Sequence, residues 1–402
     1  MHQHDHSPDE VESREELRLH LDAGTLRGLT VQGLHLTDDP PDWAKVDVTG
    51  TLFVGCHFAS VEAEIELIRR GAHVVPPFPG APYPTHPARL YTADDLSAGF
   101  AEHGFAGMFD TVVYQHFLDH GGALPGVREA LSQRMHDHGV DDALADTIDE
   151  WAAENGGPVV GIMGGHAEPR GSDGYRAAAA IGRGLARAGC LVVTGGGPGV
   201  MEAANLGAFL ATAEPADLAA AIDDLSKAPD FRDHDPFTER ALAVRERFTR
   251  NGQDANDVLG WAKHGGLSVP TWLYGHEPAN LFAARVAKYF SNAIREDTIL
   301  RLARGGIAFA SGRAGTVQEI FQAATKTFYA TDGASGPFVF LGRRFWTEEL
   351  PVATLLRPLL AGSPHGDLTH LIEITDDPAE AVEMILRYGA PADAKEAQRV
   401  TP

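Results

Sequence analysis

The sequence is poor in cysteine and in basic residues, and each shortage excludes a class of protein. Two cysteines, Cys56 and Cys190, are too few for a disulfide framework or for a metal site built on cysteine. Lysine and arginine total 33 against 56 aspartates and glutamates, which gives a formal net charge of −23. Because binding to duplex nucleic acid needs a basic surface, this balance disfavours nucleic acid as a partner.

The sequence also lacks long hydrophobic runs. No apolar stretch approaches the roughly 20 residues that a membrane-spanning helix needs. The segment MHQHDHSPDEVESREE, residues 1–16, has no apolar core of the kind found in signal peptides. These absences predict a cytoplasmic protein that does not interact with a membrane.

Patterning along the chain predicts two folded regions between two tails. Residues 1–20 are polar and acidic without apolar periodicity, which is typical of a disordered tail, and a second tail is expected over 391–402. Residues 21–155 predict a smaller N-terminal α/β module, whose role the sequence does not indicate. Residues 156–390 predict a nucleotide-binding domain.

Six short apolar runs alternate with helical segments in the region 156–390. They are VVGIM (159–163), CLVVT (190–194), LSVPTW (267–272), GIAFA (306–310), PFVFL (337–341) and LIEIT (371–375). Continuous apolar strands between helices favour a parallel sheet that is covered on both faces. The predicted fold class is α/β, with a doubly wound, mostly parallel Rossmann-like sheet. Ligands bind such sheets beyond the carboxyl ends of the strands.

The loop after the first predicted strand begins GGHAEPRG, at residue 164. Gly165 allows the backbone to approach a ligand closely, and Arg170 is a candidate for a charge-assisted bond to phosphate. A glycine pair is a weak signal, and a purely structural turn explains it equally well.

The loop after the second predicted strand, TGGGPGVMEA (194–203), is richer in glycine. Glycines expose consecutive N–H groups that form an anion-binding nest, and the dipole of the following helix adds to it. No Lys-Ser/Thr pair follows, so this is not a Walker A loop. We favour phosphate binding over a structural turn. The candidate binding residues are Thr194, Gly195, Gly196, Gly197, Gly199, Met201 and Glu202.

The loop SGRAGTVQE (311–319) follows the fourth predicted strand. Gly312 and Gly315 form the turn, Thr316 is a candidate N-cap or phosphate ligand, and Glu319 falls in the first helical turn. A glutamate that only complements the helix dipole explains Glu319 as well.

The segment before the fourth predicted strand, residues 274–297, predicts a helix that carries Arg295. The stretch HEPAN within it lacks the second histidine of a zinc-binding HExxH helix. We therefore expect no metal site.

The glycine-rich motifs GGGPGVMEAANLGA and AGTVQE, in this order at strand ends, resemble the LOG family, once described as lysine decarboxylase-like. The hallmarks of that family are GGGxxGxM and PGGxGTxxE, with an arginine on the helix between them. The matching residues are Gly195, Gly196, Gly197, Gly199, Met201, Gly312, Gly315, Thr316 and Glu319, with Arg295 as the arginine. The resemblance covers about residues 155–380.

This resemblance implies an activity and a set of residue roles. Members of the family hydrolyse the N-glycosidic bond of a nucleoside 5′-monophosphate to a free base and ribose 5-phosphate. By this resemblance Glu319 and Arg295 are catalytic, and loops 194–199 and 312–316 hold the phosphate. It also implies at least a homodimer. No cofactor is expected, and no lysine is placed to hold pyridoxal phosphate.

The sequence departs from the family at one point, where Pro-Gly-Gly is replaced by Ser311-Gly312-Arg313. An arginine brings a Cβ into a loop in which glycine would permit positive φ. Arg313 either adds a cation beside the phosphate or fills the pocket and abolishes turnover. The alternative to an enzyme is therefore a non-catalytic nucleotide-binding or sensor protein of the same fold.

Overall fold

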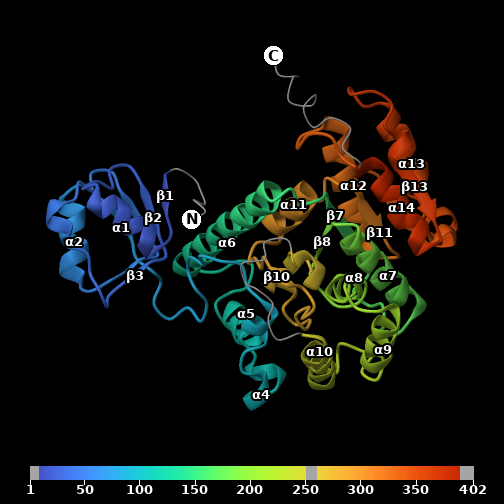
Figure 1. Ribbon diagram of the computed structural model, residues 1–402, viewed down its shortest axis with the longest axis horizontal. Coiled ribbons are helices and arrows are strands. Elements are labelled where there is room, and N and C mark those ends of the chain that lie inside the picture. The colour runs from blue at the N-terminus through green and yellow to red at the C-terminus, as the bar shows by residue number, and fades with distance from the viewer. Residues whose placement is uncertain (1–8, 250–259, 390–402) are drawn as a thin grey trace. The chain divides into compact units, whose positions relative to one another are not determined.

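The computed structural model describes residues 9–249 and 260–389, and these form two compact units (Figure 1). The described residues of the first unit are 9–90 and 115–149. Those of the second are 91–114, 150–249 and 260–389. The predicted tail over 391–402 lies outside the described residues.

The predicted disordered tail over residues 1–20 is wrong in its second half. Residues 1–8 lie outside the described part of the chain, but strand β1 (Glu10–Val11) and helix α1 (Arg14–Asp22) follow directly. A capping box starts α1: the Ser13 side chain accepts from the Glu16 N–H, while the Glu16 carboxylate accepts from the Ser13 N–H. Only Leu17 of this helix is buried, which explains why the segment shows no clear apolar periodicity.

The first unit stacks short parallel strands in the order β1-β2-β4-β6. The added strands are β2 (Thr30–Gln32), β4 (Leu52–Val54) and β6 (His73–Val75), and paired residues lie 20–22 positions apart in the sequence. A regular offset of this kind is typical of repeat architectures, in which each turn of the chain packs on the previous one. Strands β3 (His35–Leu36) and β5 (His57–Phe58) pair in the same register.

The second unit contains a seven-stranded parallel sheet in the order β10-β9-β8-β7-β11-β12-β13. This sheet confirms the predicted Rossmann-like α/β fold class. Its strands are β7 (Val159–Met163), β8 (Leu191–Thr194), β9 (Leu267–Ser268), β10 (Arg285–Val286), β11 (Ile307–Phe309), β12 (Phe338–Leu341) and β13 (Ile372–Thr375). The strand order reverses between β7 and β11, which is where such sheets open a crevice for a ligand.

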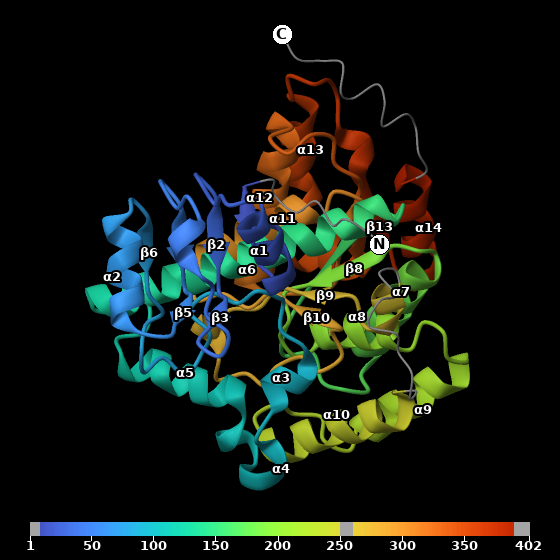
Figure 2. The same ribbon diagram turned by 60° about the vertical axis from the view of Figure 1, so that its left-hand side comes forward.

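Helices pack around this sheet. α7 (Asp173–Arg187) and α8 (Val200–Phe209) lie together beside β8 (Figures 1 and 2). They approach closely at Gly207, because glycine has no Cβ. A Cβ at this position would overlap the carbonyl oxygen of Ala179. The others in this unit include α9 (Pro215–Leu225), α10 (His234–Phe248), α11 (Asn292–Leu302), α12 (Ala314–Tyr329), α13 (Ala353–Ala361) and α14 (Pro378–Gly389).

The remaining α-helices of the described chain are α2 (Val61–Arg69), α3 (Ala93–Ser97), α4 (Phe100–His103), α5 (Phe109–Asp119) and the long α6 (Val127–Ala153). Within the described residues, none of the helices combines the length and the apolar character that crossing a membrane requires.

The predicted helix over 274–297 is wrong. The helix α11 begins only at Asn292, with Ser291 as its N-cap. Upstream, Val286 exchanges backbone hydrogen bonds with Tyr91, and the Tyr289 N–H donates to the carbonyl of Pro270. The apolar residues of this segment are buried along the edge of the sheet, and a run of buried apolar residues does not distinguish an extended segment from a helix.

Candidate functional site

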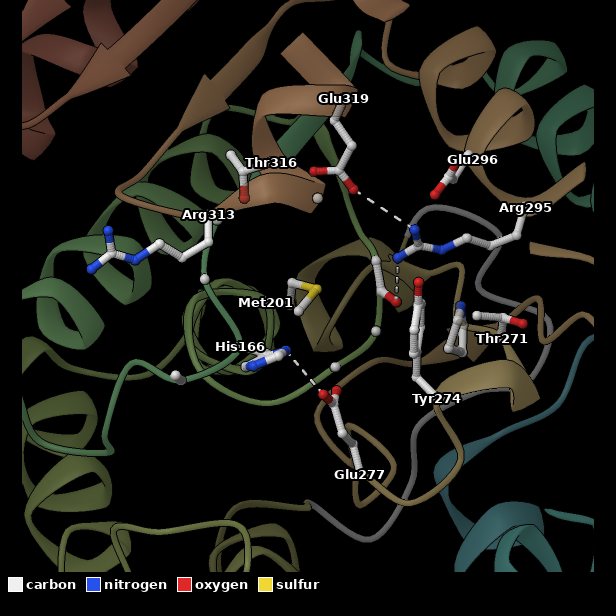
Figure 3. Close-up of a pocket in the computed structure, with 18 of the residues that line it drawn as sticks. His166, Met201, Thr271, Tyr274, Glu277, Arg295, Glu296, Arg313, Thr316 and Glu319 are labelled. Atoms are coloured by element: carbon white, nitrogen blue, oxygen red, sulfur yellow. Dashed lines mark hydrogen bonds and ion pairs between the residues drawn. The ribbon is translucent and has the colours of Figure 1, made fainter. Parts of the chain in front are cut away.

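A cavity of about 440 Å³ lies at the carboxyl ends of β7, β8, β9 and β11 (Figure 3). It therefore occupies the crevice where the strand order reverses. Ten of the predicted site residues line it: Gly165, Gly195, Gly196, Gly197, Met201, Arg295, Arg313, Gly315, Thr316 and Glu319. The structure thus brings the two glycine-rich loops and the two predicted catalytic residues to one place.

Arg170 and Glu202 are not in this cavity, and their predicted role in binding substrate is corrected. The Arg170 guanidinium donates to both carboxylate oxygens of Glu202, at 2.9 and 2.5 Å, and to the carbonyl of Phe237 at 2.8 Å. It also stacks 3.2 Å from the centre of the Phe237 ring. The Tyr175 hydroxyl donates to Glu202. Both charged side chains are 1% exposed, so their bonding capacity is used inside the fold.

The remaining three predicted residues shape the loops without lining the cavity. The Thr194 hydroxyl donates to Asn205 Oδ1 at 2.6 Å and accepts from the Gly196 N–H. Gly199 has φ +69°, and a Cβ there would lie 2.5 Å from the carbonyl oxygen of Gly165. At Gly312 a Cβ would overlap the Thr316 hydroxyl. These positions hold the loop backbones in place, which is a role different from the ligand contact that we expected.

Arg295 joins three parts of the site. It is buried at the first turn of α11, where its Nε donates to the carbonyl of Val269 at 2.8 Å and its Nη2 to the carbonyl of Gly195 at 3.2 Å. Its Nη1 lies 3.7 Å from Oε1 of Glu319 (Figure 3). Arg295 therefore fixes the glycine loop after β8 and places a positive charge beside Glu319.

Glu319 has an unusual protonation equilibrium. Burial raises its pKa to about 7, the negative charge of Glu296 adds to this, and Arg295 opposes it. The Glu319 side chain is only 13% exposed. A carboxyl group with this pKa changes protonation state near neutral pH, so it can accept a proton from water or hold one.

Arg313 does not fill the cavity. Its φ of −117° lies outside the left-handed region, so the backbone accepts a side chain at the position where the family has glycine. The side chain is exposed, and Figure 3 shows it directed away from Glu319. The expectation that Arg313 fills the pocket is therefore wrong. The other expectation, a cation at the rim of the cavity, is compatible with the structure.

Among the lining residues that the sequence analysis did not predict, His166 and Glu277 form an interacting pair. Nδ1 of His166 lies 2.9 Å from Oε1 of Glu277, and burial raises the pKa of Glu277. The histidine directly follows the glycine pair after β7, which is a signal that could have been used. Glu277 belongs to the stretch HEPAN, which we considered only as a zinc motif.

Among residues 9–249 and 260–389, no group of three or more histidine, cysteine, aspartate or glutamate side chains could hold a metal ion.

Residues 157–213 match the model of a family described as the SLOG cluster4 family. The match supports membership of the SLOG superfamily, which includes LOG-like proteins, and thus a nucleotide-related protein. It spans β7, α7, β8 and α8, so it includes the first glycine-rich motif and ends before Arg295 and Glu319. No curated protein matches the chain.

Proposed function

We propose that this protein is a LOG-like phosphoribohydrolase, which hydrolyses the N-glycosidic bond of a nucleoside 5′-monophosphate. The observation that carries the proposal is Glu319, a buried carboxyl group with a pKa of about 7 that lines a cavity of about 440 Å³. Cavities of this size accept a small ligand such as a nucleotide.

The electrostatics of the cavity suit a phosphate group. Arg295 and Arg313 line it and bring two positive charges to a chain whose net charge is −23. Lys288 lines it too, but its ammonium group is paired with the buried Asp110 at 2.5 Å. The glutamates of the lining are Glu277, Glu296 and Glu319.

Two helices begin at the cavity without a side-chain cap. These are α8 after Gly199 and α12 after Arg313, whereas the serines Ser172 and Ser291 cap α7 and α11. An uncapped N-terminus leaves N–H groups and the positive end of the helix dipole for an anion. We place the 5′-phosphate at the start of α12, beside Thr316 and Arg313.

The chemistry requires a group that stabilises positive charge on the sugar. Cleavage of an N-glycosidic bond passes through an oxocarbenium-like transition state, and a carboxylate beside the sugar stabilises it and accepts a proton from the attacking water. Glu319 performs both tasks in this proposal. Arg295 holds Glu319 and the glycine loop, and it stays bonded to two carbonyl groups throughout.

A second candidate function is nucleotide binding without hydrolysis, as in a sensor. The exposed guanidinium of Arg313 favours this alternative, because it replaces a glycine of the family motif with a group that can retain a phosphate. Both candidates use the same cavity and differ only in turnover.

Chromatography of AMP, GMP, CMP, UMP and IMP after incubation with the purified chain tests the proposal. We expect free base from at least one nucleotide, and a fall in kcat on the order of 10²-fold or more for Glu319→Gln. Glu348→Gln, on an exposed helical turn, is the matched control. Thermal shift with each nucleotide measures binding separately. Binding without release of base would reject the enzyme and support the sensor, and the absence of both would reject both.

A further inference from the structure

A histidine and a second carboxylate line the cavity on the side away from Glu319, and neither belongs to a glycine-rich motif. His166 lies in the loop after β7, and Glu277 lies in the loop between the turn 272–274 and β10. Figure 3 shows the two side chains pointing toward each other across the lower part of the cavity, with Nδ1 of His166 2.9 Å from Oε1 of Glu277.

Each member of the pair packs against a neighbouring residue that restricts its position. The ring of His166 packs edge-on against Phe231, with 5.8 Å between ring centres. The Glu277 carboxylate fits over Gly197, where a Cβ would lie 3.2 Å from Oε2. The Glu277 side chain is 11% exposed and that of His166 is 55% exposed. A buried carboxylate therefore fixes one nitrogen of an accessible imidazole.

This arrangement is a familiar one for proton transfer. A carboxylate bonded to Nδ1–H sets the tautomer of the ring and stabilises the imidazolium, while Nε2 exchanges a proton with the substrate. No described residue forms a hydrogen bond with Nε2 of His166. The charged groups that surround Glu277 are His166, His276, Arg295 and Lys288, and all of them favour its ionised form against the effect of burial.

The proposed reaction needs such a proton donor. When the bond between C1′ and the base nitrogen breaks, the electron pair stays on the base, which is a poor leaving group as an anion. Protonation of the base in the transition state removes this charge. Glu319 cannot donate this proton while it accepts one from water.

We propose that His166, oriented by Glu277, is the general acid that protonates the departing base. This inference rests on the proposed function. The C1′–N bond breaks as Nε2 of His166 gives its proton to a ring nitrogen of the base. Water forms the new C1′–O bond, and its proton passes to Glu319. Exchange with solvent then returns a proton to His166 and removes one from Glu319.

Two nucleotides that differ in their need for a proton test this role. GMP requires protonation of its base, whereas 7-methylguanosine 5′-monophosphate already carries a positive charge on the base, which leaves as a neutral molecule. The variants are His166→Ala and Glu277→Gln in the full chain. His365→Ala removes an exposed histidine that does not line the cavity and serves as the control. Thermal unfolding checks the fold of each variant.

For His166→Ala we expect kcat on GMP to fall on the order of 10²-fold or more, with little change on the methylated nucleotide. For Glu277→Gln we expect a smaller loss on GMP, again with little change on the methylated nucleotide. A merely structural role of Glu277 would instead lower kcat on both nucleotides equally.

Equal losses on both nucleotides would overturn the inference, because the pair would then only shape the cavity. Full activity of His166→Ala on GMP would overturn it as well. If the wild-type chain releases base from none of AMP, GMP, CMP, UMP, IMP and the methylated nucleotide, the proposed function fails and this inference fails with it. If the wild-type chain cleaves both nucleotides and the variants lose activity on both equally, the general-acid role of His166 is contradicted while the proposed function stands.

Discussion

Two arginine–glutamate pairs lie in the loops and helices around the seven-stranded sheet. They differ in how many of their hydrogen-bonding atoms already have partners within the protein. Arg170 and Glu202 form a closed pair with two hydrogen bonds, at 2.9 and 2.5 Å, away from the cavity. Arg295 and Glu319 form an open pair, 3.7 Å apart, that lines the cavity. The closed pair holds loops and helices together, whereas the open pair keeps a carboxylate available for chemistry.

The open pair also shows why a nearby arginine does not by itself keep a carboxylate ionised. A close cation lowers the pKa of a carboxyl group, and burial raises it. At Glu319 burial prevails and the pKa rises to about 7, because Arg295 is some distance away and donates two of its bonds to backbone carbonyls. The geometry of the contact decides the outcome, and the residue types alone do not.

Breaking the closed pair should give the largest loss of stability. Arg170→Ala leaves the Glu202 carboxylate buried without its cation, which typically costs about 3–5 kcal/mol of unfolding free energy. Urea denaturation measures the loss, with Arg344→Ala, an exposed arginine, as the control. Replacing both partners, as in Arg170→Met with Glu202→Leu, should recover part of the loss. A loss below about 1 kcal/mol for the single variant would contradict a structural role for the pair.

Neutralising Glu319, the carboxylate of the open pair, should have the opposite effect and raise the free energy of unfolding. The pKa of Glu319 is about 7 in the fold, against 4.5 for an ordinary glutamate. The folded state therefore binds a proton more tightly than the unfolded state, and ionisation of Glu319 costs stability as the pH rises from 4.5 through 7. Glu319→Gln removes this cost, so the variant should exceed wild type by up to about 3 kcal/mol at pH 8 and match it near pH 4.

Urea denaturation of Glu319→Gln and wild type at pH 4, 6 and 8 measures this difference, and Glu348→Gln at an exposed position controls for the loss of a charge. A stability difference that does not change with pH would show that the pKa of Glu319 is not raised. Higher stability together with lost activity would show that this position is selected for chemistry.

The sheet and the cavity could be predicted because their signals are local. Apolar runs that end in glycine-rich turns predict strands and the loops at their carboxyl ends, and the two motifs therefore meet at the crevice. The partner of Arg170 is not a local property. Glu202 lies 32 residues away, and α8 brings it to the arginine. From sequence, Arg170 and Arg295 are equal candidates, and only the fold shows that Arg295 lines the cavity whereas Arg170 does not.

The repeat in the first unit escaped prediction for a related reason. The segments VQGLHL (31–36) and FVGCHF (53–58) are copies of one turn, and the rings of His35 and His57 stack 4.2 Å apart. Each copy holds a strand of two or three residues, which is too short for an apolar pattern to stand out. The glycine and histidine at the same spacing in both copies are the signal that could have shown the period.

Replacing Arg313 should have the smallest effect of these substitutions. Its side chain has no hydrogen-bond or ion-pair partner among the described residues, so only an interaction with a ligand would be lost. If its role is to hold a phosphate at the start of α12, Arg313→Gln should weaken nucleotide binding by about fivefold, since an exposed ion pair contributes up to about 1 kcal/mol. The backbone angle at this position accepts any residue, so stability should not change. Isothermal titration at low and high salt measures the effect, which should vanish at high salt because ions screen exposed charges.

Arg313→Lys keeps the charge and should keep most of the affinity. A loss that persists at high salt, or that Lys does not restore, would mean that Arg313 acts through the shape of the loop. In that case the cation at the cavity rim would have no part in binding, and the open pair with the uncapped helices would carry the site alone.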